Sequence, residues 1–403
     1  MLSTSFSPWP SFTPEEMDAV QRVLASNRVS YWTGEEGRIF EREFAAWAGA
    51  KHAIAVTNGT VALDLALRAL GIGPDDEVVV TPRTFIASVS CAVNAGATPV
   101  FADVDRDSGN LSAETIAAVL TPRTRAVIVV HLAGWPCEMA PIMELADRHG
   151  FKVIEDCAQA HGARYEGRSV GTIGHIGAWS FCQDKIMTTA GEGGMVTTND
   201  DELWSRMWSF KDHGKSWRAV YERQPPPGYR WLHESFGTNW RMLEVQAAIG
   251  RIQLRRMQGW VAARQKNADV IGAALAAWTD GDRPLRVPRY PEKKNANLES
   301  ISQHAHYKFY AYVDPERLPA GWSRDRIISD INKRGVPCYQ GSCSEIYLEK
   351  AFDETPWRPR ERLPVARELG DSSLMFLVHP TLTDDEVRRT AEVAAAVFRS
   401  VYS

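Results

Sequence analysis

Lys185 is the residue whose type and surroundings first suggest chemistry, in the stretch SFCQDKIMTTAGEGG that covers residues 180–194. A lysine amine attacks a carbonyl only when it is unprotonated, so a nucleophilic lysine needs partial burial or a nearby positive charge. Trp179 and Phe181 are bulky and apolar, and the glycines that follow allow close backbone approach to a ligand. A solvated loop lysine would fit the same letters, so this stretch alone leaves both roles open.

A carboxylate stands at the end of a predicted strand in VIEDCAQAHGA, where an apolar run leads into Glu155 and Asp156. A fixed negative charge at such a position can keep a pyridinium nitrogen protonated. An aspartate at a strand end also commonly caps a helix or forms half of a salt bridge, and this is the more frequent role.

An anion site is suggested in TNGTVALDLALRAL, where a strand ends at Val56 and a helix is expected from about Val61. The amides of Gly59 and Thr60 would then point at an anion, with the Thr60 hydroxyl beside them. An ordinary helix capped by threonine is the alternative. Neither a Walker loop nor a complete dinucleotide fingerprint is present. An anion site, a carboxylate and a lysine are together the three handles that pyridoxal phosphate requires.

The elements that must position these groups follow from the alternation of short β-rich runs with helical patterns between residues 50 and 200, which predicts an α/β sheet with parallel neighbours. Ligands in such sheets bind at the carboxyl ends of the strands. The predicted strands cover residues 52–56, 77–82, 99–104, 126–131 and 151–156.

The rest of the chain predicts a second, smaller domain. Residues 238–275 have apolar residues at helical spacing, and residues 282–300 are rich in proline, lysine and asparagine, as in an exposed connection. A strand over 304–313 and a helix over 324–335 follow. We therefore expect a large domain over residues 1–260 and a smaller α+β domain over 261–403.

Composition narrows the partners. The 403 residues are 44% hydrophobic, which is enough for a sizeable core, and the formal charge of −4 gives no basic excess for nucleic acid. No stretch suits a signal peptide or a membrane span. The six cysteines are scattered without C-x-x-C spacing, so we expect no metal site and reduced thiols in a cytoplasmic protein; they are Cys91, Cys137, Cys157, Cys182, Cys338 and Cys343.

Several ordered blocks carry a family resemblance: YWTGEEGRIFEREFAAWAG, NGTVALDLAL, TPRTFIAS, IEDCAQAHGA, the lysine segment and GTNWRMLEVQAAIG. With them the chain resembles the sugar aminotransferases of the DegT/DnrJ/EryC1/StrS group over nearly its whole length. The resemblance implies the aspartate aminotransferase (type I) fold, an α/β architecture with a mostly parallel sheet in the large domain and a smaller C-terminal α+β domain. It also implies pyridoxal 5'-phosphate as cofactor.

The resemblance assigns roles around the cofactor ring. Lys185 matches the lysine that forms an imine with the cofactor, and Asp156 matches the partner of the pyridine nitrogen. Phe85 matches an aromatic residue that stacks on the ring, which suits a flat π-system. Gln159 falls where the family places a side chain near the phenolic oxygen.

The resemblance also assigns the phosphate ligands. Gly59, Thr60 and Ser180 match residues that hold the phosphate within one subunit. Asn239 matches a residue that reaches the phosphate of the other subunit, which implies an obligate homodimer with composite sites. Alternatively or in addition, Asn239 caps a helix that begins near Arg241.

The reaction implied is a ping-pong transamination from L-glutamate, which leaves as 2-oxoglutarate, to a keto-sugar that we expect to be nucleotide-linked. Such amino sugars serve surface polysaccharide, lipopolysaccharide or related products. A sugar dehydratase or lyase of the same fold is the first alternative, although related dehydratases carry histidine at the lysine position. A non-catalytic regulator that keeps the cofactor is the second.

Two histidines and one segment have no assigned role from the sequence. His161 and His213 suit structural roles better than catalytic ones. The segment over residues 211–233, with three consecutive prolines, departs from the family pattern, as does YQGSCSEIY near the C-terminus. The candidate basic residues for contact with a substrate diphosphate or carboxylate are Lys211, Lys215, Arg230 and Arg241.

Overall fold

A seven-stranded sheet forms the centre of the computed structural model, which describes residues 6–224, 227–228, 230–279, 283–290 and 302–401. The strand order is β1-β9-β8-β5-β4-β2-β3. Only β9 runs antiparallel to its neighbours, so the sheet is mostly parallel as predicted. The bounds are β1 (His52–Val56), β2 (Glu77–Val80), β3 (Thr98–Phe101), β4 (Thr124–Val130), β5 (Lys152–Asp156), β8 (Ile176–Ser180) and β9 (Gly194–Thr198).

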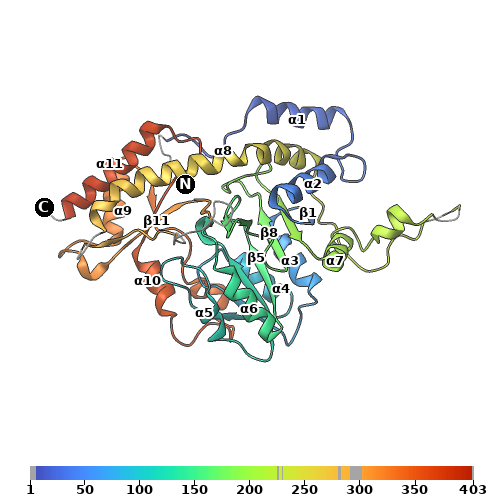
Figure 1. The fold of residues 1–403 in the computed structure, drawn as a ribbon, viewed down its shortest axis with the longest axis horizontal. Coiled ribbons are helices and arrows are strands. Elements are labelled where there is room, and N and C mark those ends of the chain that lie inside the picture. The colour runs from blue at the N-terminus through green and yellow to red at the C-terminus, as the bar shows by residue number, and fades with distance from the viewer. Residues whose placement is uncertain (1–5, 225–226, 229, 280–282, 291–301, 402–403) are drawn as a thin grey trace.

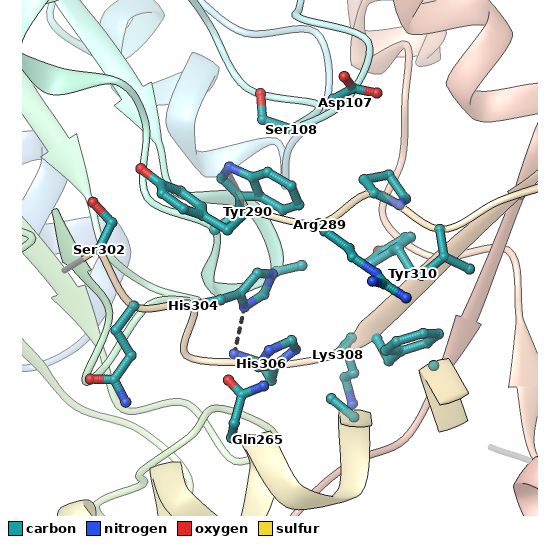
Figure 2. A pocket seen from close by; sticks show the side chains of 18 of the residues that line it. Asp107, Ser108, Gln265, Arg289, Tyr290, Ser302, His304, His306, Lys308 and Tyr310 are labelled. Atoms are coloured by element: carbon teal, nitrogen blue, oxygen red, sulfur yellow. Dashed lines mark hydrogen bonds between the residues drawn. The ribbon is translucent and has the colours of Figure 1, made fainter. Parts of the chain in front are cut away.

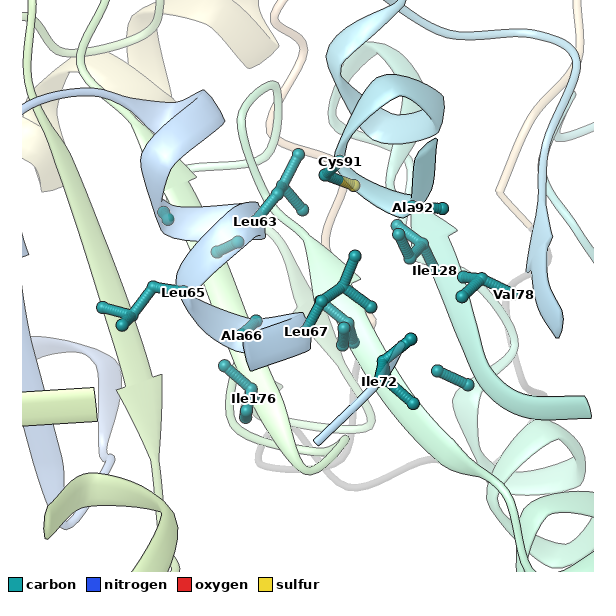
Figure 3. Close-up of a cluster of buried hydrophobic side chains, with 14 of the residues drawn as sticks. Leu63, Leu65, Ala66, Leu67, Ile72, Val78, Cys91, Ala92, Ile128 and Ile176 are labelled. Atoms are coloured by element: carbon teal, nitrogen blue, oxygen red, sulfur yellow. The ribbon is translucent and has the colours of Figure 1, made fainter. Parts of the chain in front are cut away.

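Helices cover this sheet and supply its core. On one side, Leu63 and Leu67 of α3 pack with Cys91 of α4 against Val78 of β2 and Ile128 of β4, all buried (Figure 3). These buried strands read as near-continuous apolar runs because helices shield them from water. The helices that follow the strands are α3 (Gly59–Ala69), α4 (Ala87–Asn94), α5 (Ala113–Ala117), α6 (Met139–His149) and α7 (Asp201–Lys211).

The start of α3 differs from the alternative offered by the sequence. The helix begins at Gly59, two residues before Val61, and its N-cap is Asn58, whose Oδ1 accepts the Val61 amide at 2.9 Å. Thr60 is therefore not the cap. Gly59 and Thr60 occupy the first two helical positions, where amides have no partner within the helix.

The smaller C-terminal sheet is antiparallel, in the order β10-β11-β13-β12. The expected strand over 304–313 begins only at Phe309, because residues 305 and 307 instead donate backbone hydrogen bonds to Gly134 and Ala133. The elements are β10 (Leu285–Arg286), β11 (Phe309–Val313), β12 (Cys338–Tyr339), β13 (Ser373–Phe376), α9 (Arg324–Lys333), α10 (Pro364–Ser372) and α11 (Asp384–Val401). Most of the predicted connection over 282–300 lies outside the described residues; a hairpin of β6 (Arg164–Tyr165) and β7 (Arg168–Ser169) stands apart.

Helix α8 (Glu244–Leu275) runs along both sheets and links the two parts of the chain (Figure 1). It contacts α1 (Pro14–Ala25), α2 (Glu36–Ala48) and α11. It begins at Glu244 rather than near residue 238, and it continues through residue 260, so the domain boundary proposed there stays a prediction. Phe6 packs in the C-terminal core. None of the described helices combines the length and apolar character that a bilayer crossing requires.

The segment between α7 and α8, drawn in yellow-green, extends away from the body of the molecule (Figure 1). It contains one helical turn, Arg218–Glu222. Trp217 at the base of this turn packs against Trp204 and Trp208 of α7, with ring centroids 5.1 and 5.0 Å apart. This anchored extension is the segment that departs from the family pattern.

Close packing of β8 on the turn at Gly171 generates a prediction about Gly177. A Cβ at residue 177 would lie 2.4 Å from both the Gly171 carbonyl oxygen and Thr197 Oγ1. We expect Gly177→Ala to lower the free energy of unfolding by about 1–3 kcal/mol, measured by urea denaturation. Gly259→Ala is the matched control, because a Cβ there meets nothing within 4 Å in a helix and should stabilise by about 0.5–1 kcal/mol. Equal effects of the two changes would contradict this packing.

Candidate active site

Asp156 is buried at the carboxyl end of β5, between the ends of β4 and β8. Its Oδ2 accepts the Ser88 hydroxyl at 2.7 Å and its Oδ1 accepts the Ala158 amide at 3.0 Å. Burial raises the pKa of Asp156, although these hydrogen bonds and the charge of Lys185 act in the opposite direction. A cation brought to this carboxylate would favour its charged form, and a protonated pyridine nitrogen provides such a cation.

Glu155, by contrast, points to the other side of the sheet and is fully hydrogen-bonded. It accepts the amides of Gly171, Ile173 and Gly174 at 2.8, 2.8 and 2.6 Å, and His131 Nε2 lies 3.0 Å away. Burial alone would raise the pKa of Glu155, but the interactions with His131 and the amides outweigh it, so the pKa lies below its usual range. Glu155 is therefore a structural anchor for the 171–174 turn.

His131, Glu155 and Cys157 lie close enough together to resemble a metal-binding group. His131 Nδ1, however, accepts the Cys137 amide at 2.9 Å, which places the imidazole proton on Nε2, facing Glu155. Burial raises the pKa of the Cys157 thiol well above its usual range. The protonated thiol of Cys157 is a poor metal ligand. His131 and Glu155 already use their lone pairs in hydrogen bonds, so they are poor metal ligands as well.

The predicted phosphate ligands come together where α3 passes the end of β8. A Cβ at residue 59 would lie 2.5 Å from Ser180 Cβ, so only glycine allows this approach. Ser180 is buried, and its Oγ accepts the Cys182 amide at 3.3 Å. A helix N-terminus with adjacent hydroxyls suits a phosphate group.

Lys185 lies on the turn after β8, with 16% of its side chain exposed. Its Nζ is 3.8 Å from Asp184 Oδ1 and 5.3 Å from the ring centroid of Tyr307. The Trp9 indole donates a 2.8 Å hydrogen bond to the Lys185 carbonyl. Neither Asp184, Tyr307 nor Trp9 was identified from the sequence; the position of Asp184 next to Lys185 was the one available signal.

Phe85 and Gln159, which the resemblance assigns to the cofactor ring, differ in exposure. Phe85 follows β2 and is 68% exposed, an unusual cost for a phenylalanine unless a ring or a second subunit covers it. Gln159 is buried, and its Oε1 accepts the Ala133 amide at 2.8 Å, which leaves its NH₂ group to donate elsewhere. Ser88, at the first turn of α4, donates its one hydroxyl proton to Asp156 and therefore accepts the Thr84 hydroxyl at 2.8 Å.

Asn239 is exposed and does not cap a helix, because α8 begins at Glu244 with Leu243 in the cap position. The helix-cap alternative for Asn239 is therefore wrong. Asn239 forms a β-bridge with Asp212, and its Oδ1 lies 3.4 Å from the Arg241 amide. The exposed side-chain amide of Asn239 is accessible to a second subunit.

Strand order explains why three of these groups meet. The chain after β1 leads into the helix start at Gly59. Ser180 ends β8 and Lys185 follows it, while Asp156 ends β5, and β8 is adjacent to β5. The site thus offers an anion cradle, a carboxylate and a lysine on one edge of the sheet. These residues fit pyridoxal phosphate: the cradle fits its phosphate, the buried carboxylate its ring nitrogen and the amine its carbonyl carbon.

The basic residues considered for a substrate anion are engaged within the protein. Lys211 is fully buried, with Nζ 3.8 Å from Glu41 Oε1 and over the Tyr31 ring, and burial lowers its pKa. Lys215 and Arg241 both pair with the buried Asp212, at 3.0 and 2.7 Å. Arg230 donates to the backbone carbonyls of residues 219 and 220.

The two histidines left open by the sequence differ in environment. His161 is fully buried between Trp179 and Phe181, and neither ring nitrogen has a partner among the described residues. Burial, with the charges of Lys185 and Arg264, lowers its pKa to about 3, so it is neutral. His213 is exposed, and its carbonyl lies 2.8 Å from His233 Nδ1.

A cavity of about 1350 Å³ lies between the large domain and the C-terminal domain (Figure 2). His304, His306 and Lys308 line it from the segment before β11, and burial lowers the pKa of His306 to about 4 and that of Lys308 to about 8. The described lining residues include none of the eight predicted site residues. Ala133 lines this cavity, pairs with Tyr307 through its carbonyl and donates its amide to Gln159 Oε1.

Comparisons with known proteins agree with this geometry. The model of the DegT/DnrJ/EryC1/StrS aminotransferase family matches residues 10–396. The chain is 38% identical over 367 residues to the GDP-perosamine synthase of Caulobacter vibrioides, covering 89% of this chain and 90% of that one. It is 42% identical over 375 residues, 93% and 89% of the two chains, to the dTDP-3-amino-3,4,6-trideoxy-alpha-D-glucose transaminase of Streptomyces venezuelae. The X-ray structure of an aminotransferase from Psychrobacter cryohalolentis shares 64% identity and a TM-score of 0.96 over 99% of this chain and 100% of that one.

The buried Glu155 anchor generates a prediction about stability and pH. Glu155→Gln replaces an acceptor of three amides by a group that also carries donors, so we expect a loss of about 2–4 kcal/mol of unfolding free energy at neutral pH. Because the folded-state pKa of Glu155 is depressed, its contribution is present above the ordinary glutamate pKa and is lost as pH falls through the folded value.

The difference in unfolding free energy between wild type and Glu155→Gln should accordingly become smaller as denaturation is repeated at successively more acidic pH. The exposed Glu361 provides the matched control, and Glu361→Gln should change stability by no more than about 0.5 kcal/mol. A pH-independent difference for Glu155→Gln would show that the ionised carboxylate is not what holds the turn.

Proposed function

Because the chain belongs to the DegT/DnrJ/EryC1/StrS aminotransferase family, we propose that it transfers an amino group from L-glutamate to a keto-sugar carried on a nucleotide. The chain is a pyridoxal-phosphate-dependent aminotransferase with the type I fold. The observation that carries the proposal is the placement of Lys185, Asp156 and the Gly59–Ser180 cradle at the ends of β8, β5 and β1.

Bound pyridoxal phosphate supplies an electron sink that stabilises negative charge on the carbon beside the transferred amine. With the cofactor bound, Lys185 Nζ would move a proton from the α-carbon of the donor to the cofactor carbon that keeps the nitrogen, and in the second half of the cycle it would move a proton from that carbon to the acceptor carbon. Asp156 keeps a proton on the ring nitrogen, and the Ser88 hydroxyl holds Oδ2 of Asp156 in place. Lysine at position 185 favours transamination over the dehydratase or lyase alternative.

The remaining predicted residues bind and orient. In the proposal, Gly59, Thr60 and Ser180 hold the phosphate, Phe85 covers one face of the ring and Gln159 donates to the phenolic oxygen. Asn239 reaches the phosphate of a second copy, so the working unit is a homodimer. The exposure of Phe85 and of Phe236, at 97%, supports a second subunit over this rim.

The substrate class rests on the relatives. Two of them are named for GDP- and dTDP-linked amino sugars, and this supports a nucleotide-linked acceptor here. L-Glutamate as donor, a role in surface polysaccharide or lipopolysaccharide synthesis and a cytoplasmic location are the finer parts of the proposal. The sheet-edge site itself does not distinguish among nucleotides or ring positions.

A half-reaction assay tests the donor and the lysine together. Incubation of cofactor-loaded enzyme with L-glutamate alone should release one 2-oxoglutarate per site and convert the cofactor to its amino form, seen as a loss of visible absorbance. Lys185→Ala should lose both the visible absorbance of the imine and more than about 10³-fold in rate, because the variant lacks the amine proposed to form the imine and to move the proton.

Lys333→Ala, which removes an exposed lysine at the end of α9, serves as control and should match wild type. Adding candidate keto-sugar nucleotides to the amino form and watching the absorbance return identifies the acceptor. Sustained turnover by Lys185→Ala would refute its role, and sugar dehydration without 2-oxoglutarate release would favour the lyase alternative.

A mixing experiment tests the role of Asn239 across subunits. Lys185→Ala and Asn239→Ala proteins should each be weakly active, since one lacks the amine and the other a phosphate ligand. If Asn239 acts in the partner's site, mixed dimers contain one site with both residues intact. Unfolding and refolding the two variants together in equal amounts should then restore roughly a quarter of wild-type activity. Absence of recovery, with mixed dimers shown by differential tagging, would place Asn239 in its own subunit's site.

A further inference from the structure

Tyr307 brings the C-terminal domain to the candidate nucleophile. It is buried just before β11, and its amide donates a 2.8 Å hydrogen bond to the Ala133 carbonyl. The Ala133 amide in turn donates to Gln159 Oε1. One backbone contact therefore ties Tyr307 to the wall of the cofactor site, and the ring is held where Lys185 Nζ lies 5.3 Å from its centroid.

Asp184 links the phenol of Tyr307 to the amine of Lys185. Its Oδ2 accepts a short hydrogen bond from the Tyr307 hydroxyl, and its Oδ1 lies 3.8 Å from Lys185 Nζ. Asp184 is 60% exposed, so without the Tyr307 hydroxyl its carboxylate would be free to turn toward water. The hydrogen bond gives an exposed carboxylate one fixed orientation beside the amine.

The backbone of this turn is held from the other side. Trp9 donates to the Lys185 carbonyl, and the buried Arg264 stacks over Trp9, 5.2 Å from its centroid, while donating to the Tyr307 carbonyl at 3.2 Å. Lys185 and Tyr307 thus share a frame made of Trp9 and Arg264. Relative motion of the amine and the phenol is limited to their side chains.

We infer that Asp184 and Tyr307 are positioning residues for Lys185, with Asp184 stabilising positive charge on Nζ and Tyr307 fixing the carboxylate that does so. The inference rests on the proposed role of Lys185 as the cofactor lysine. During turnover Nζ gains a proton from the donor carbon and later gives it up; the Asp184 carboxylate stays ionised and accepts no proton. The pair works through Lys185 without touching the reacting carbon.

The charges around Nζ define what the pair contributes. Lys308 and Arg264 are positive neighbours in the same region, with Lys308 Nζ 4.8 Å from the Tyr307 ring, while His161 is neutral. Asp156 is the other carboxylate within electrostatic reach of Lys185, and in the proposed site it faces the ring nitrogen. Asp184 is therefore the acid available to balance the cations around Nζ.

The test is a pH titration of the visible absorbance of bound pyridoxal phosphate, which reports the proton on Nζ independently of turnover. We expect Asp184→Asn to lower the apparent pKa of this absorbance by roughly half a pH unit to one unit, since a carboxylate that favours the protonated form is gone. Tyr307→Phe should shift it in the same direction by less, and Asp184→Glu should restore most of the wild-type value. Asp184→Asn and Tyr307→Phe should each reduce kcat several-fold, with little change in the KM for either substrate.

Two control variants distinguish a specific effect on Lys185 from the general effect of removing a carboxylate or a phenol hydroxyl. Asp18→Asn removes one exposed carboxylate on α1, and Tyr339→Phe removes a phenol hydroxyl in the same domain as Tyr307. An unchanged titration in Asp184→Asn, or an equal shift in Asp18→Asn, would overturn the inference. If Asp184→Asn binds no cofactor, a wild-type titration in Tyr307→Phe overturns it instead. Failure of the proposed function itself looks different, because Lys185→Ala would then keep the visible absorbance.

Discussion

The buried carboxylate of Asp156 at the end of β5 is the constraint on which the rest of the site depends. Placing a carboxylate inside a sheet edge costs free energy, and here the Ser88 hydroxyl, the Ala158 amide and the charge of Lys185 offset part of that cost. A cation bound against Asp156 offsets the remaining cost of burying this carboxylate. A pyridinium ring held against Asp156 then has its orientation set, and the phosphate cradle and the lysine must lie at matching distances along the same edge.

Parallel strand packing provides those distances. Because β5 and β8 are adjacent and parallel, their carboxyl ends lie side by side, and Asp156 and Ser180 are carried to the same edge. The close approach of α3 to β8 at Gly59 brings the helix N-terminus to the same place. Glu155, one residue earlier, faces the opposite side of the sheet because side chains alternate along a strand. Its amide ligands and His131 hold the turn that supports β8.

The C-terminal domain contributes a side chain, that of Tyr307, to the surroundings of Lys185. Tyr307 enters the large domain through backbone pairing with the turn after β4, and the same turn donates to Gln159. The N-terminal segment closes the frame through Trp9. Three distant parts of the chain therefore meet at one lysine, and the position of its amine depends on how the two domains dock along α8.

The sequence by itself determined five of the strands in the large domain and the helices between them, because buried parallel strands and their crossover helices leave clear apolar patterns; β8 and β9 were not predicted. It also singled out Asp156 and the Gly59 helix start, since each follows a predicted strand, and Lys185, because its residue type and its apolar and glycine neighbours suit a nucleophile. Helix ends were less certain: Asn58 rather than Thr60 caps α3, and α8 begins at Glu244, because a cap depends on local geometry that several polar residues can satisfy. Only the tertiary structure decided the partners of these groups. Ser88 on Asp156, Tyr307 on Asp184 and the burial of Lys211 against Glu41 join residues far apart in the chain, and contacts of that kind arise from tertiary packing, which no local pattern encodes.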